Sequence, residues 1–102
     1  MIYVIATIEL NQDCKDDFLK IFLDNVPHVK AEQGCLTYAP TVDLDSGIPV
    51  QGKLRADTVT IVEAWESLDD LQRHLKAPHM AAYREKVKDL VKQVTIQVLQ
   101  PV

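Results

Sequence analysis

Apolar and polar side chains alternate at the start of the chain and then change to a helical spacing. From Ile2 to Leu10 the residues on one side are all apolar, which is the pattern of a strand with one buried face. Segment 11–13 offers helix-capping side chains, and the apolar residues after it predict an amphipathic helix to about Glu32. Pro27 lies inside this helix, so we expect a kink or a restart there.

Two further strands with a long loop between them are predicted for the middle of the chain. Residues 35–43 form the first of these, although a proline inside it suggests an edge strand or a bulge. Its apolar side chains are expected to share one face: Leu36, Tyr38 and Val42. Residues 44–56 contain two glycines and a proline and predict the long loop, and residues 57–66 predict the third strand.

The second helical region is predicted to be broken in two. Ser67 with the acidic residues after it is typical of a capped helix start. This helix should stop before Pro78, because a residue that precedes proline is pushed out of the α region. Pro78 can itself begin a further helix that runs to about Asp89. Alternation returns over residues 93–98 and predicts a final strand.

The resulting order βαββαβ is typical of a ferredoxin-like α+β fold with an antiparallel sheet. At 102 residues, we expect the chain to form a single domain that covers residues 1–102. Helices cover one face of such a sheet, and the other face still carries apolar side chains here. We therefore expect a second copy to cover that face in a homodimer.

Composition narrows the functional classes. The net charge is −4 without a basic stripe, so nucleic-acid binding is not expected. No segment approaches the ~20 apolar residues of a membrane span, and the N-terminus lacks the features of a signal peptide, so we expect a cytoplasmic protein. Cys14 and Cys35 show no metal or disulfide spacing, and we expect both to be reduced and Cys35 to be buried.

One acidic residue interrupts the apolar row of the third strand. Glu63 falls on the same face as Val59, Ile61 and Trp65. A carboxylate in such a row has a raised pKa, pairs with a cation or lines a cavity, because burying a bare charge is costly. A structural ion pair is the simpler interpretation, and a site carboxylate is the alternative.

Two histidines flank the predicted helix break. His74 precedes Pro78 and His79 follows it, with Tyr83 one helical turn after His79. Trp65 ends the strand that leads into this region. These groups either form a pocket, in which an imidazole could take a proton from a phenol-like substrate, or are structural and surface residues.

Other ligand chemistry has less support in the sequence. For His28, a surface position is the simpler interpretation, and Trp65 and Tyr38 could be core aromatics. The histidine spacing is not that of a helical zinc pair, so we expect no metal site. No glycine-rich phosphate loop is present, and redox chemistry would have to draw its electrons from the substrate.

Three segments, followed by Tyr83, carry a resemblance to a known family: EQGCLTY at 32–38, VTIVEAWES at 59–67 and HLKAPHM at 74–80. In this order and spacing they resemble the signatures of the antibiotic biosynthesis monooxygenase superfamily across essentially the whole chain. Within it the chain looks most similar to the bacterial quinol monooxygenases.

This resemblance implies a dimeric α+β barrel with a pocket in each subunit. It also implies that O2 oxidises a menadiol-like dihydroxyaromatic without a metal or bound cofactor. His74 or His79 would act as base or hydrogen-bond anchor, and Glu63 would orient or tune a histidine. Four further residues would bind the substrate: Trp65, Tyr83, Tyr38 and Met80.

Two alternatives to the oxygenase remain open. One is an isomerase of the same superfamily that acts on a phosphorylated signalling sugar and needs a cationic cluster, for which the chain offers Lys53, Arg55 and Arg84. The other is a dimeric ligand-binding domain without catalysis. Haem degradation is disfavoured, because the family residues it requires have no match at the corresponding positions: Ala6 or Thr7, His74 and Arg84.

Overall fold

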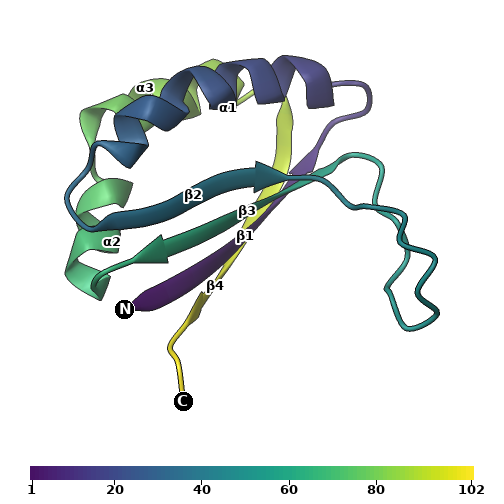
Figure 1. The fold of residues 1–102 in the computed structure, drawn as a ribbon. Coiled ribbons are helices and arrows are strands. Elements are labelled where there is room, and N and C mark those ends of the chain that lie inside the picture. Colours follow the sequence, from purple (N-terminus) through teal and green to yellow (C-terminus); the bar gives the residue numbers. More distant parts are fainter.

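The structure is a computed structural model that describes residues 1–102. Its elements follow in the order β1 (Ile2–Leu10), α1 (Lys15–Lys30), β2 (Cys35–Thr41), β3 (Thr58–Trp65), α2 (Leu68–Leu75), α3 (Pro78–Val87) and β4 (Val91–Leu99). The strands form one antiparallel sheet in the order β2-β3-β1-β4, and α1 and α3 lie over one of its faces (Figure 1). This is the predicted ferredoxin-like α+β fold, including the break of the second helical region at Pro78.

The core lies between the sheet and the helices. Alternate residues of β1 and β3 point into it, and Phe18 and Phe22 of α1 cover them. Burial of these side chains is the main stabilising contribution, at about 25 cal/mol per Å² of apolar surface. The strand side chains involved are Val4, Ala6, Ile8, Leu10, Val59 and Ile61.

The first helix differs from its prediction at its start. Cys14 is the N-cap and forms no side-chain capping bond, so the capping role predicted for residues 11–13 is wrong. Asp13 turns the chain with a φ of 63°, and the Asn11 side chain donates a hydrogen bond to the backbone oxygen of Asp89 instead. At its other end, α1 continues through Pro27 as one helix, without the restart that the proline suggested.

A bulge in β2 changes which side chains face the core. The pairing of β2 with β3 shifts between Cys35 and Thr37, so Leu36 is 50% exposed while Tyr38 is buried. The predicted common face of Leu36, Tyr38 and Val42 is therefore wrong, and Val42 lies beyond the strand end. Cys35 is half-buried rather than buried, and both cysteines are free.

Gly34 and Ser67 bring α2 against the end of α1. Ser67 caps α2 by accepting a hydrogen bond from the Asp70 backbone N–H at 3.2 Å. Gly34 has a φ of +81°, and a side chain there would collide with the buried Asp70 carboxylate. Only glycine combines this left-handed backbone with this close approach.

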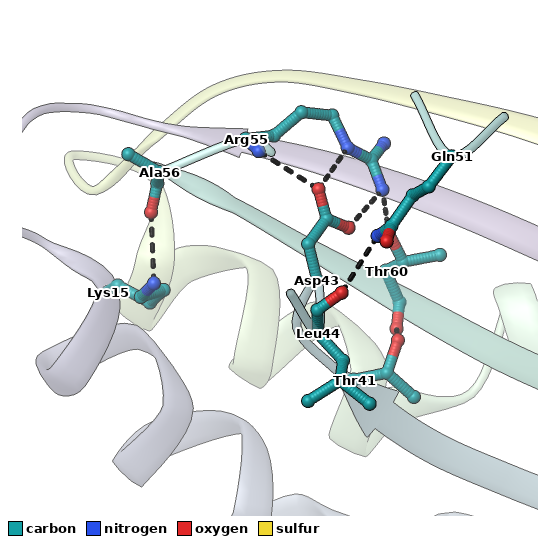
Figure 2. A network of polar contacts seen from close by, with 8 residues as sticks. All are labelled: Lys15, Thr41, Asp43, Leu44, Gln51, Arg55, Ala56 and Thr60. Atoms are coloured by element: carbon teal, nitrogen blue, oxygen red, sulfur yellow. Dashed lines mark hydrogen bonds and ion pairs between the residues drawn. The ribbon is translucent and has the colours of Figure 1, made fainter. Parts of the chain in front are cut away.

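Residues 42–57 form an arm that projects away from the sheet (Figure 1). Arg55 donates two side-chain hydrogen bonds to the Asp43 carboxylate, which holds the pKa of Asp43 down at about 2 (Figure 2). The Gln51 side chain donates to the backbone oxygen of Leu44, and Lys15 donates to that of Ala56 at the base of the arm (Figure 2). The arm is thus held together by its own polar contacts.

Helices cover only part of the sheet. On the helix-facing side, β4 presents a row of exposed apolar side chains, whereas the same side of β1 is buried. The opposite face of the sheet is also open and carries Tyr3, Val62 and Leu99 at the surface. No helix is both long and apolar enough to cross a membrane.

Candidate active site

An apolar cavity of about 320 Å³ opens between the helices and strands β1, β3 and β4. Twelve of its sixteen lining residues are hydrophobic, among them Phe22, Tyr38, Met80 and Tyr83. The four others are Glu63, His74, Arg84 and Lys88. A mostly apolar pocket with a few polar groups is typical of a small-molecule site.

His74 brings a buried imidazole to this cavity. It lies in the last turn of α2, and its Nδ1 is 2.7 Å from Oε2 of Glu32, which lies two residues after the end of α1. Burial lowers the pKa of His74, and the contact with Glu32 opposes that shift. A neutral ring that donates its Nδ1 proton to Glu32 leaves Nε2 as a free proton acceptor.

Glu63 brings a buried carboxyl group to the same cavity. Its Oε1 accepts a hydrogen bond from the indole nitrogen of Trp65 at 2.9 Å. Burial raises the pKa of Glu63 to about 7, the negative charge of Glu32 adds to this, and the bond from Trp65 opposes it. No hydrogen bond joins Glu63 to either histidine, so the contact with His74 is made by Glu32 instead.

Aromatic rings shape the cavity wall. Tyr38 stacks on Phe22 at 5.4 Å between ring centroids, and Tyr83 meets Phe22 edge to face at 5.7 Å. Burial raises the pKa of both tyrosines, so their phenols stay protonated at neutral pH. Trp65 is fully buried and lies behind the lining, where its ring is 4.7 Å from that of His74.

His79 lies on the other side of Glu32. Its Nε2 is 3.5 Å from Oε1 of Glu32, and neither ring nitrogen makes a hydrogen bond. The ring lines a second, polar groove of about 280 Å³ between α1 and α3, together with His28 and Lys86. The structure thus brings six of the seven predicted site residues to or directly behind the cavity and places His79 in a separate groove.

The three predicted cationic residues do not form a cluster. Arg55 is paired with Asp43, and Lys53 lies in the same exposed arm. Of these three residues, only Arg84 lines the cavity, and its Nη2 donates to the backbone oxygen of Leu75 at 2.6 Å. No group of three or more histidine, cysteine or acidic residues is placed to hold a metal ion.

Glu32 is the site residue that the sequence analysis did not assign a role. It is separated from His74 by 42 positions, and no periodic pattern connects them. The only signal in the sequence was local: Glu32 lies two residues before Gly34, where the chain turns closely past Asp70 of α2.

The chain is thus a small α+β protein whose ferredoxin-like sheet holds an imidazole and a carboxyl group in an apolar cavity. The family model for antibiotic biosynthesis monooxygenase matches residues 1–86, and the chain belongs to this family. This membership and the curated relatives support an enzyme with a monooxygenase type of function.

Sequence relatives cover the whole chain. The protein of Escherichia coli named Probable quinol monooxygenase YgiN is 41% identical over 107 aligned residues, which cover 99% of this chain and 98% of that protein. A protein of the same name from Shigella flexneri matches with the same identity and the same coverage.

Solved structures share the fold. A protein of Pseudomonas aeruginosa superposes with a TM-score of 0.80 at 22% identity, covering 99% of this chain and 93% of that one. The protein Rv0793 of Mycobacterium tuberculosis superposes with a TM-score of 0.79 at 24% identity, covering 99% and 94%.

Proposed function

We propose that this protein oxidises a menadiol-like dihydroxyaromatic with O2 and uses no metal or bound cofactor. The observation that carries the proposal is the apolar, ring-lined cavity that holds both His74 and Glu63. The names of the Escherichia coli and Shigella flexneri relatives support a quinol as the substrate.

In this proposal His74 is the base. Nε2 of His74 takes a proton from one quinol hydroxyl, and Glu32 holds the ring in the tautomer that permits this. The quinolate that forms is electron-rich and reduces O2, and the dry cavity keeps both reactants together. Simple oxidation balances as one quinol and one O2 giving one quinone and one hydrogen peroxide.

Glu63 serves as the second polar group. With its pKa near 7, the carboxyl group can accept or return a proton at neutral pH. Trp65 holds it in place, and the rings of Tyr38 and Tyr83 with the thioether of Met80 enclose the substrate ring. His79 acts through Glu32 rather than on the substrate, because it lies outside the cavity.

A homodimer is part of the proposal. The face of the sheet opposite the helices carries exposed apolar residues from three strands, including Tyr3, Val62 and Leu99. A second copy that packs its own open face there would remove this surface from water. Each subunit would retain its own cavity, since the cavity lies on the helix side.

The isomerase alternative is less well supported. Phosphate recognition calls for converging cations, and two of the three candidates lie in the arm, where Arg55 is already neutralised. The apolar cavity instead favours a flat, uncharged ring.

Oxygen uptake tests the proposal. We expect metal-stripped protein to consume O2 with menadiol above the spontaneous autoxidation rate, with saturation as menadiol increases. Chelator should leave the rate unchanged, and ¹⁸O2 distinguishes insertion of oxygen into the product from release of hydrogen peroxide. A rate equal to autoxidation would overturn the proposal.

A further inference from the structure

The cavity continues into an apolar strip that no part of the chain covers. Val94, Ile96 and Val98 of β4 pair with residues of β1 that are buried in the core, so they lie on the helix-facing side of the sheet. They are nevertheless 55%, 43% and 44% exposed. Val94 and Ile96 line the cavity, and Val98 extends the row beyond it. We call these three residues the β4 strip.

The size of the cavity limits what it can enclose. A volume of about 320 Å³ lies at the lower end of the range for small-molecule sites, which is roughly 300–1,000 Å³. It suits a ring system of modest size but leaves little room for a long substituent. Such a substituent has to extend out of the cavity. The β4 strip offers an apolar path, because Val94 and Ile96 belong to the lining and Val98 continues the row outside it.

We propose that the substrate is a quinol with an apolar alkyl or prenyl chain that lies along the β4 strip. This inference rests on the proposed function, since it takes the quinol ring to occupy the cavity. From Val94 to Val98 the strand advances about 13 Å, at about 3.3 Å per residue. A chain along this path covers side chains that otherwise stay in water, and each methylene group that it buries adds to the affinity.

The charges at the cavity are compatible with this arrangement. Arg84 and Lys88 line it one helical turn apart on the α3 side. Lys88 is paired with Glu85 at 2.6 Å, and Arg84 donates to a backbone oxygen. The β4 strip itself contains no charged residue, so an apolar chain meets no buried charge there.

Binding and turnover of two matched compounds test the inference. The probes are menadione and 2-methyl-3-geranyl-1,4-naphthoquinone, which differ only in the chain. We expect the geranyl compound to bind at least tenfold more tightly by calorimetry, and its quinol to show a KM at least tenfold lower than that of menadiol. Equal affinities and equal KM values would overturn the proposal.

Two neighbouring substitutions locate the chain. Val98→Ser removes an apolar side chain of the strip, and Leu99→Ser removes an equally exposed one (43% against 44%) from the opposite face. Leu99 lies on the face that the proposed homodimer would cover, so any effect of its loss acts on both compounds alike. We expect Val98→Ser to reduce the ratio of the two affinities about threefold and Leu99→Ser to leave that ratio unchanged. Equal effects of both variants would contradict the assignment of the chain to the strip.

These experiments distinguish a failure of this inference from a failure of the proposed function. If the geranyl compound binds more tightly but neither quinol is oxidised above background, the proposed function fails and the chain site stands. If the wild type oxidises menadiol and the chain brings no advantage, only the chain site fails. If Val98→Ser instead lowers the mass of the assembly by sedimentation, a second copy covers the strip, and the proposal is wrong.

Discussion

His74 and His79 lie on two sides of the same carboxylate in opposite surroundings. His74 is 2% exposed, lines an apolar cavity and lies 2.7 Å from Glu32. His79 is 27% exposed, lines a polar groove and lies 3.5 Å from the other oxygen of Glu32. The sequence treats them alike, as histidines around one proline, and the fold gives them different environments. Burial and a short, directed hydrogen bond are what make an imidazole a useful base.

Removal of the buried histidine should have the largest effect. We expect His74→Ala to lower kcat with menadiol by about 100-fold or more, because general-base catalysis contributes roughly 10²–10⁴. Oxygen uptake measures the rate, and circular dichroism checks the fold. His28→Ala, an exposed histidine on α1, is the matched control and should keep its activity. A His74→Ala variant that is folded and fully active would exclude His74 as the base.

A pH series tests whether Glu63, which lines the same cavity as His74, stays protonated to a higher pH than an exposed carboxyl group. Its folded pKa of about 7 lies above the unfolded value of 4.5, so the neutral form favours the folded state. This contribution is complete below pH 4.5 and is lost as the pH rises through 7, by roughly 3 kcal/mol. Urea unfolding should therefore show that wild type loses roughly 3 kcal/mol of stability relative to Glu63→Gln between pH 4.5 and pH 8. A difference that does not depend on pH would contradict the raised pKa.

Gly34 controls the approach of α2 that brings His74 to Glu32. We expect Gly34→Ala to lower the free energy of unfolding by about 2 kcal/mol, because a methyl group collides with Asp70 and the φ of +81° is strained. Gly47→Ala is the control, since Gly47 also has a positive φ, of 71°, but has open space around it. Thermal unfolding should show a clearly larger loss for Gly34→Ala, and equal losses would mean that the close approach to Asp70 is unimportant.

Glu32→Gln separates the charge of the shared carboxylate from its shape. The charge of Glu32 raises the pKa of His74, so its loss should lower that pKa further and move the acidic limb of the kcat/KM profile to lower pH. We expect kcat/KM at neutral pH to fall about tenfold, as for loss of a charge-assisted hydrogen bond. Rates between pH 5 and 9, with an NMR titration of His74, measure both effects. An unchanged profile would show that Glu32 does not act on His74.

His79→Ala should have the smallest effect. His79 does not line the cavity and its contact with Glu32 is long, so we expect kcat with menadiol to change less than about twofold. The same oxygen-uptake assay measures it beside His74→Ala. A loss as large as that of His74→Ala would reverse the comparison and make His79 part of the reaction.

Local patterns predicted most of the fold but only part of the site. Alternation in β1 and β3, the Ser67 cap and Pro78 act over a few residues, so each could be read from the sequence. The bulge after Cys35 inverts the exposure of Leu36 and left no signal in the alternation. The pairing of Glu32 with His74 depends on how two helices meet across Gly34, which is a tertiary property.

The antiparallel pairing of β1 with β4 also has a topological consequence. Tyr3 and Leu99 are direct partners, so the two ends of the chain lie side by side at one edge of the molecule (Figure 1). The arm around Gly47 is exposed and far along the chain from both. A short linker between the present ends and a new opening at the arm would therefore give a circular permutant whose β2 and β3 no longer follow one another in the chain. The cavity would be preserved, since neither the arm nor residues 1–5 and 97–102 contribute to its lining.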